Sequence, residues 1–383
     1  MRQRLEIIPI SLAGDLRAGG WVMTAAVQGD TDSISPGDYL QYRGRALASF
    51  VDPALRFAFG GWVIGQPDFS FDRYSSQAQI QFATPHALLA GGSLQDVSFA
   101  VVSSVNNSHE QATSPGWKFS TITEHILKSH TNYVYDADGS DGSPDGIITT
   151  LDFDTNSTLF NQVGDYFIVN QSTNLWSTLS GNLAGGEEGG IEFFRLWFDR
   201  RGVLHRSMAP PFISPQPTSK GTLTKAHMRG SVQVRYLNSQ PGQRVGQVQI
   251  VAGIRPSTIF NAQYPASPGE GKILKKNSGI WANDQTRANL LATRLYKWLT
   301  RTYTITVQVD AGLALFGDDG LGLDLGNRIA LTYNGPAEDS DTGAGVHLNL
   351  SAASFYVYGI NINFNPERKL ATATLQLEMD NSA

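Results

Sequence analysis

The sequence predicts a mainly β fold in which two related β domains flank a mixed α/β middle, and three observations support this prediction. Segments in which apolar and polar residues alternate recur toward both ends of the chain, a pattern typical of half-buried strands. A phrase near the start recurs in altered form near the end. Aromatic residues make up 10% of the 383 residues, which favours a folded, β-rich protein over a disordered one.

The first predicted domain, residues 1–97, consists of short strands separated by turns. Residues 35–38 (Ser-Pro-Gly-Asp) form a turn signal that precedes a strand. The apolar run 57–64 contains two adjacent glycines, which indicate a bend or a bulge. Residues 77–82 then alternate strictly between glutamines and apolar residues, and 84–89 predict a short helix.

The predicted middle domain, residues 98–217, mixes helices and strands. Thr-Ile-Thr-Glu at 121–124 is a capping box that opens a short amphipathic helix. A second helix is predicted around 172–183, where leucines recur every four residues. Residues 191–206 predict a strand, a turn and a strand, and the proline-rich run 209–217 is typical of a domain boundary.

The last predicted domain, residues 218–383, returns to strands and contains one long helix at about 284–301. Two strands, 232–236 and 247–251, flank Pro241-Gly242 and predict a hairpin. Three further segments alternate cleanly and predict strands: 304–309, 360–365 and 371–377.

The recurring phrase links the two ends of the chain. Pro36-Gly-Asp-Tyr-Leu-Gln-Tyr42 is similar to Leu325-Gly-Asn-Arg-Ile-Ala-Leu331. Each copy is followed by an aromatic strand that contains glycine, a polar turn and an alternating strand. This echo predicts that the first and last domains are related to each other.

The polar faces of the alternating strands carry almost no charge. Charged residues make up only 16% of the chain, against about 25% in an average globular protein. Solvated strands usually include Lys and Glu, whereas uncharged polar faces are tolerated within an interface. Ordinary solvated strands that happen to lack charge are the alternative interpretation. The candidate faces comprise Gln77, Gln79, Gln81, Thr304, Thr306, Gln308, Asn361, Asn363, Thr372, Thr374 and Gln376.

Composition excludes several classes of function. The absence of cysteine excludes thiol catalysis, Cys-ligated zinc and iron–sulfur clusters. A net charge of −5 without a basic block argues against sequence-independent binding of duplex DNA. The chain contains no run of 18 apolar residues and opens without an apolar signal-peptide core, so neither a membrane span nor a signal peptide is expected.

One acidic loop is a weak candidate for calcium binding. Its four carboxylates provide the oxygen ligands that Ca²⁺ prefers, but an aspartate occupies the sixth position, where an EF-hand loop requires glycine. A solvated loop is the favoured interpretation. The candidate ligands are Asp136, Asp138, Asp141 and Asp145.

Sequence motifs give no support for catalysis. Asp341-Thr-Gly343 matches the aspartic-protease triplet, but it follows a polar loop and has no second copy, so a plain loop is favoured. The seven histidines are scattered, and no phosphate loop or serine-hydrolase elbow occurs. We therefore expect no enzyme activity, no metal and no cofactor.

The order of these elements resembles the baseplate hub proteins of tailed phages and related contractile injection systems. In that family, a helix like 172–184 precedes a hairpin like 193–204, and a helix like 288–295 runs into a β domain. That domain holds a phrase like 323–331 and a strand like 356–362. The resemblance covers nearly the whole chain. It departs from the family pattern after the glycine of the second phrase, where Asn replaces the usual acidic residue.

The resemblance implies two tail-tube-like β-barrel domains that flank the mixed α/β domain. Three chains would form a ring of six barrels, a homotrimeric hub that joins the six-fold tail tube to the three-fold tip. Expected partners are other copies of the chain, the tail tube and other tail-tip or baseplate proteins, with DNA only as passing cargo. The polar strand faces would form subunit contacts or the channel wall.

The resemblance also implies a location in the virion, after assembly in the host cytoplasm. A different class of function is kept as the alternative, namely an extracellular β-rich module that binds carbohydrate or calcium as a receptor-binding tail component.

Overall fold

The computed structural model describes most of the chain outside the middle range. The described residues are 7–27, 34–44, 56–71, 76–91, 97–100, 117–118, 151–153, 163–164, 166–169, 174–182, 194–208, 217–236, 244–255, 258–279, 285–301, 303–316, 322–365 and 370–379.

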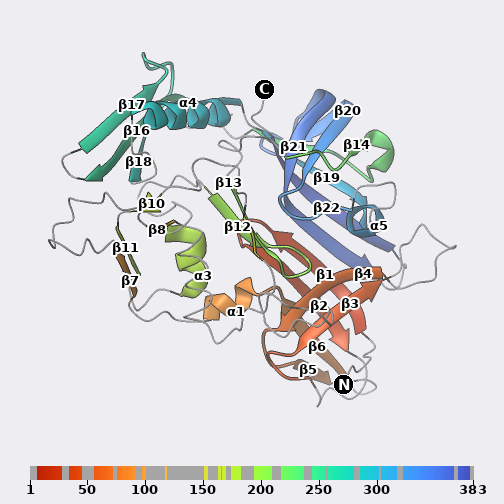
Figure 1. The fold of residues 1–383 in the computed structure, drawn as a ribbon. Helices are drawn as coiled ribbons and strands as arrows, with labels where there is room; N and C mark the ends of the chain where they lie inside the picture. The colour runs from red at the N-terminus through yellow and green to blue at the C-terminus, as the bar shows by residue number, and fades with distance from the viewer. Residues whose placement is uncertain are drawn as a thin grey trace.

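Strands from both ends of the chain form one twelve-stranded sheet (Figure 1). The N-terminal half contributes β1 (Ile7–Asp15), β2 (Gly20–Val27), β3 (Tyr39–Gly44), β4 (Arg56–Val63), β5 (Asp68–Phe71) and β6 (Ser76–Ala83). The C-terminal half contributes β14 (Thr222–Thr224), β15 (Gln233–Tyr236), β19 (Tyr303–Asp310), β20 (Arg328–Asp339), β21 (Gly345–Asn365) and β22 (Leu370–Met379). The halves join where β1 pairs antiparallel with β21.

The two halves share one pairing scheme, so the echo in the sequence corresponds to a structural repeat. In the first half, β2 pairs with β1 and β6, β6 with β4, and β4 with β3. In the second half, β19 pairs with β15 and β22, β22 with β21, and β21 with β20. All eight pairings are antiparallel. We call β1–β6 the first repeat, and β15 with β19–β22 the second repeat.

The echoed turn of the first repeat is held by four hydrogen bonds around Gly37, whose φ is +93°. The Asp38 side chain accepts the N–H of Ser35 at 2.7 Å, and the Asp38 N–H donates to the Ser35 carbonyl at 3.1 Å. The Gly37 N–H donates to the carbonyl of Val63, whose own N–H donates to the Asp38 carbonyl. The turn therefore fastens the start of β3 to the end of β4.

The same four bonds recur in the second repeat around Gly326, whose φ is +74°. The Asn327 side chain accepts the N–H of Asp324 at 2.9 Å, and the Asn327 N–H donates to the Asp324 carbonyl at 3.2 Å. The Gly326 N–H donates to the carbonyl of Val357, whose own N–H donates to the Asn327 carbonyl. Because the position needs only an acceptor oxygen, asparagine serves here as well as an acidic residue.

The second repeat closes into a barrel. β15 runs parallel to the end of β20, where Gln233 lies opposite Glu338, and β14 runs parallel to its start. The pairings therefore form a ring through β20, β21, β22, β19 and β15. Among the described strands of the first repeat, no pairing closes the corresponding ring, and β3 ends the sheet. A single buried apolar cluster draws side chains from both repeats.

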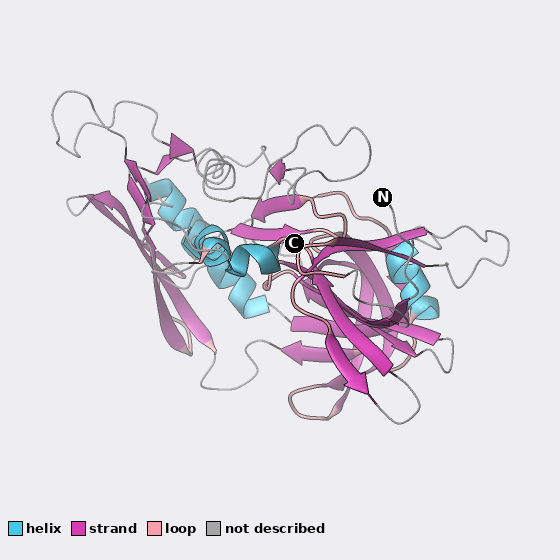
Figure 2. Ribbon diagram, turned by 90° about the horizontal axis from the view of Figure 1, so that it is seen from below, coloured by secondary structure: helices cyan, strands magenta, loops and turns pink. Residues whose placement is uncertain are grey.

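A separate unit interrupts the second repeat between β15 and β19. Its strands β16 (Val245–Arg255), β17 (Thr258–Tyr264) and β18 (Lys272–Gly279) form a sheet in the order β17-β16-β18. Helix α4 (Gln285–Arg301) packs on β16 and β17 and confirms the predicted long helix. We call residues 244–301 the insert. Figure 2 shows it to one side of the large sheet.

The insert explains why the predicted hairpin around Pro241-Gly242 is wrong. β15 pairs with β19 and β20, whereas β16 pairs with β17 and β18. Alternation of apolar residues identifies a strand and its buried face but carries no information about its partner.

The remaining elements are short. The paired strands are β7 (Val97–Ala100) with β11 (Tyr166–Val169), β8 (Trp117–Lys118) with β10 (Val163–Gly164), and β13 (Leu204–Met208) with β9 (Leu151–Phe153) and β12 (Phe194–Phe198). The helices are α1 (His86–Gly91), α3 (Leu175–Ser177), which continues as a π-helical turn (Thr178–Asn182), α5 (Ala311–Phe316) and a 3-10 turn (Lys225–His227).

These elements confirm the predicted short helix before residue 90, the helix around 172–183 and the β12–β13 hairpin. Asn174 caps α3, since its side-chain oxygen accepts the N–H of Ser177 at 2.6 Å. The predicted helix at 121–127 and the acidic loop lie outside the described residues. In the part of the chain that is described, no helix has the length and apolarity of a membrane span.

Candidate assembly surface and the junction between the repeats

Ten of the eleven predicted face residues lie on one face of the twelve-stranded sheet, opposite the buried core. The neighbours that alternate with them point inward, and Ile305, Val307 and Leu375 among these are at most 1% exposed. The side chain of the eleventh, Gln77 in β6, lies outside what the structure describes. We call this surface the polar face.

Strand register aligns the polar face into rows that cross both repeats. One row runs from β19 to β6 through Asp310, Thr372, Asn363, Ser11, Thr24 and Gln81. The next runs through Gln308, Thr374, Asn361, Ala13, Val22 and Ala83. A third runs through Thr306, Gln376, Gly359, Asp15 and Gly20. Residues from the two ends of the sequence thus share one continuous surface.

The three rows contain two charged residues, and both are acidic. Asp310 forms an ion pair with Arg229, 2.7 Å from Nη2. The Asp15 carboxylate accepts the N–H groups of Arg17 and Ala18 within the β1–β2 turn. No lysine or arginine belongs to these three rows. The next row, through Thr304, holds Arg235, Glu378 and Arg328, so cations occur only at that end of the face.

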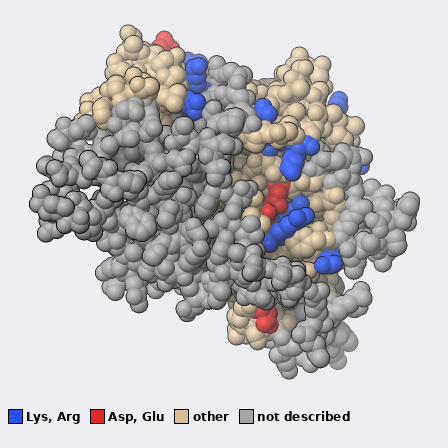
Figure 3. Space-filling model, in the orientation of Figure 1, with Lys and Arg blue, Asp and Glu red and all other residues tan. Residues whose placement is uncertain are grey.

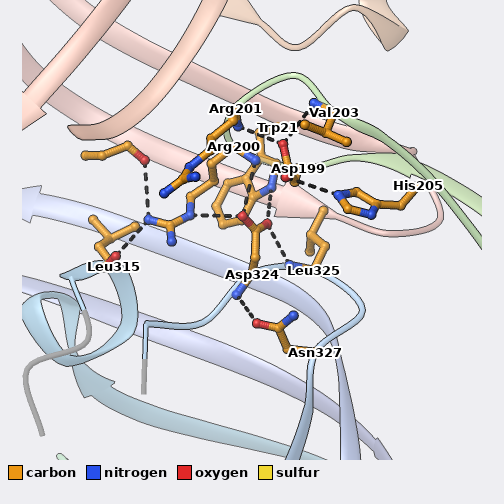
Figure 4. Close-up of polar contacts among 11 residues, drawn as sticks. Trp21, Asp199, Arg200, Arg201, Val203, His205, Leu315, Asp324, Leu325 and Asn327 are labelled. Atoms are coloured by element: carbon orange, nitrogen blue, oxygen red, sulfur yellow. Dashed lines mark hydrogen bonds and ion pairs between the residues drawn. The ribbon is translucent and has the colours of Figure 1, made fainter. Parts of the chain in front are cut away.

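A second feature is the junction, where the tip of the β12–β13 hairpin lies between the two repeats (Figure 4). The Arg200 guanidinium donates to the carbonyl of Ala58 in β4 at 3.3 Å and to that of Leu315 in α5 at 2.9 Å. Its Nε donates to the Asp324 carboxylate at 3.2 Å. The Gly60 N–H donates to the Arg200 carbonyl at 3.0 Å. One side chain thereby contacts both repeats.

Asp324 is the acceptor at the centre of this junction. Its Oδ1 accepts the indole N–H of Trp21 at 3.0 Å and the N–H of Leu325 at 2.8 Å. Its Oδ2 accepts both the backbone N–H and Nε of Arg200. Burial raises the pKa of Asp324, and the positive charge of Arg200 opposes that rise.

Asp199 shapes the hairpin turn that presents Arg200. Its carboxylate accepts the N–H groups of Arg201 and Val203, and it lies 3.1 Å from Nε2 of His205. Burial alone would raise the pKa of Asp199, but the hydrogen bond and charge of His205, with the two backbone N–H groups, outweigh burial and lower it. The turn therefore holds an ionised carboxylate at its base.

A buried ion pair fixes the other end of the hairpin. Arg195 of β12 contacts Glu378 of β22 with Nη1 and Oε2 2.6 Å apart, and both side chains are at most 5% exposed. Trp197, two residues further along β12 on the same face, belongs to the buried apolar cluster that both repeats share. The hairpin therefore packs as part of the core of the two repeats.

The other sequence candidates gain no support as catalytic or metal sites. Asp341 lies in the turn between β20 and β21, and its carboxylate is 3.5 Å from Nε of Arg235, which confirms the loop interpretation. Among the described residues, no cluster of three His, Asp or Glu side chains is arranged to hold a metal ion. The calcium candidates Asp136, Asp138, Asp141 and Asp145 lie outside those residues, so that hypothesis stays a prediction.

Sequence reasoning missed the junction, although two signals were present. Arg195 is the only charged residue in the run Phe193-Phe-Arg-Leu-Trp-Phe198, and such a residue must find a counter-ion when the run is buried. Asp324 occupies the position that Ser35 has in the first copy of the echo. Because charged residues are rare in this chain, Arg195 and Asp324 were each a signal of a specific polar contact.

Comparison with known proteins identifies the fold. No protein-family model matches the sequence, and no curated protein matches it significantly. A tail protein from Neisseria meningitidis MC58 superposes with a TM-score of 0.58 at 11% identity, over 97% of this chain and 92% of that chain. The 43 kDa tail protein of prophage MuSo2 from Shewanella oneidensis gives 0.53 at 10% identity, over 98% and 94%.

The fold expected from the sequence resemblance is therefore confirmed. The chain is mainly β and shares the fold of these tail proteins, and the likeness extends over almost its whole length. At this level of identity, the likeness establishes the fold alone.

Proposed function

We propose that this chain is a non-enzymatic structural subunit of a tail tip, in which three copies form a hub around a central passage. The observation that carries the proposal is the duplication, in which two repeats with one pairing scheme lie in one continuous sheet. Three such chains present six similar repeats, which is the number needed to meet a six-fold tube while keeping three-fold symmetry.

The polar face is proposed as the wall of that passage. It crosses both repeats in unbroken rows, and a wall shared by neighbouring repeats needs that continuity. The three rows that cross both repeats hold no basic residue, and a wall without cations along those rows would not retain passing DNA. A subunit interface would also tolerate amides and hydroxyls, so the wall and the interface must be separated by experiment.

The oligomeric state is the first test. Native mass spectrometry and sedimentation of the purified chain are expected to give a trimer, or a ring that docks on purified tail-tube protein. A stable monomer without affinity for tube protein would refute the hub.

Cysteine labelling then separates the wall from a subunit contact, because the natural chain has no cysteine. Asn361→Cys, at the centre of the polar face, is expected to react with a small maleimide in the assembled ring as fast as in the separated subunit. Asn349→Cys, exposed elsewhere on β21, is the matched control. Protection of position 361 alone on assembly would assign the face to a subunit contact.

A further inference from the structure

The insert differs from the rest of the chain in charge. Residues 244–301 hold nine Lys or Arg and two Asp or Glu, a formal net charge of +7. Because the whole chain carries −5, the other 325 residues together carry −12. In Figure 3 the insert lies at the upper left, with basic side chains along its right side and acidic atoms at its top. The insert is thus a positively charged unit on an acidic chain.

One face of the insert's sheet carries exposed aliphatic side chains. α4 covers the face that holds Val248 and Ile250. The opposite face exposes Val251, Ile259 and Ile273, the last two at 58% and 45%. We call this the outer face. They are three of the six large hydrophobic side chains that are exposed among the described residues, and this concentration on one small sheet favours an interaction surface.

The neighbours of these residues indicate a protein partner. Gln249 and Gln263 lie beside them in the same register, and Lys275 is the charged residue among the described side chains of this face. A nucleic-acid surface would instead combine several cations with aromatic rings for stacking. A face of amide and aliphatic side chains on a positively charged unit is instead complementary to an acidic protein surface.

The two outer strands of this sheet are unequal. β18 carries three lysines, Lys272, Lys275 and Lys276, and lysine on an edge discourages uncontrolled strand pairing. β17, which presents Ile259, carries no charged residue. Each of the three strands thus contributes one exposed aliphatic residue to the outer face, and β18 adds Lys275 to it.

We propose that the outer face of the insert docks on a neighbouring copy of this chain. The inference rests on the hub proposed above, and it names the surface through which one copy meets the next. A closed ring of identical chains needs two different, complementary faces on each copy. A +7 insert and a remainder of −12 supply that complementarity. With strands of about seven residues, the face measures roughly 23 Å by 14 Å, so it forms part of the interface.

Two pairs of variants test the contact by sedimentation equilibrium of the full chain. Ile259→Thr with Ile273→Thr removes the two most exposed of the three aliphatic side chains and keeps a β-branched residue at each position. Its control, Leu290→Gln, replaces a 41% exposed leucine on α4 of the same insert. We expect the double variant to raise the dissociation constant at least about tenfold, and the control to leave it unchanged.

Charge reversal tests the electrostatic attraction between the insert and the neighbouring copy. Lys272→Glu with Lys275→Glu is expected to weaken assembly at low salt, with an effect that fades as salt screens the charges. Its control is Lys220→Glu with Lys225→Glu, two exposed lysines beside the second repeat. Equal effects in both pairs would overturn the proposal, because net charge alone would then explain the loss.

The outcomes separate this inference from the hub itself. A wild-type trimer that none of the insert variants weakens overturns the docking surface and leaves the hub standing. A wild-type monomer at all concentrations overturns both. If the insert variants lower thermal stability while assembly is unchanged, the contact lies within one copy, and the proposal is wrong.

Discussion

The echoed turns offer a matched pair of glycines with which to test the packing of the hairpin on the second repeat. Gly37 and Gly326 occupy equivalent positions with φ of +93° and +74°, a region that costs a residue with a Cβ about 1–2 kcal/mol. A Cβ at Gly37 would have no neighbour within 4 Å. A Cβ at Gly326 would lie within 3.0 Å of three atoms of the Trp197 ring.

The difference between the two sites sets the expected magnitude. Gly37→Ala should lower the free energy of unfolding by about 1–2 kcal/mol, the backbone cost alone. Gly326→Ala should add about 1–3 kcal/mol of overpacking, because Trp197 is buried and cannot move aside freely. Urea titration followed by tryptophan fluorescence measures both variants under the same conditions.

A second variant isolates the clash. In a Trp197→Leu background, Gly326→Ala should cost no more than Gly37→Ala, because the smaller side chain leaves space for the added methyl group. If Gly37→Ala and Gly326→Ala lower the free energy of unfolding equally in the natural background, Trp197 does not pack closely against Gly326 and the reasoning is refuted.

Three further predictions concern buried titratable groups. Removing either partner of the buried ion pair, by Arg195→Met or Glu378→Leu, should cost about 3–5 kcal/mol, whereas removing both should cost far less. A double-mutant cycle in urea measures this, and a coupling energy near zero would contradict it. Burial lowers the pKa of His86 to about 4, below its unfolded value of 6.5, so stability should fall as pH drops from 7 to 4, by about 3 kcal/mol. His86→Gln should flatten that part of the melting-temperature profile, and an unchanged slope would refute the assignment. Arg200→Met removes the cation that opposes the raised pKa of Asp324, so its loss of stability should be larger at pH 7 than at pH 4.5. Melting temperatures at the two pH values check this, and an equal loss at both would count against the pairing.

The insert limits what the sequence could say about strand pairing. Alternation in 232–236 identified a strand correctly, but its partner β19 begins at Tyr303, beyond the whole insert. Local turn chemistry at Pro241-Gly242 suggested a nearer partner. A hairpin motif depends on a few neighbouring residues, whereas the strand with which β15 pairs depends on the packing of the entire barrel.

The sequence signals at the junction did not show which residues meet there, for a related reason. Three residues far apart along the chain meet here: Trp21 in β2, Arg200 in the turn between β12 and β13, and Asp324 in the loop before β20. Nothing in their local sequence says that they meet. Only the closing of the second repeat against the first brings the carboxylate, the indole and the guanidinium within hydrogen-bond distance.

By itself, the sequence determined which side of the alternating strands is buried, that the two ends are related, and that the polar faces of those strands lack charge. These properties follow from side-chain period and composition, which are local. The tertiary structure alone decided that the polar faces form one surface, that a basic insert splits the second repeat, and that a hairpin locks the repeats together. Those features depend on pairings between distant segments, and such pairings are selected by the packing of the whole core.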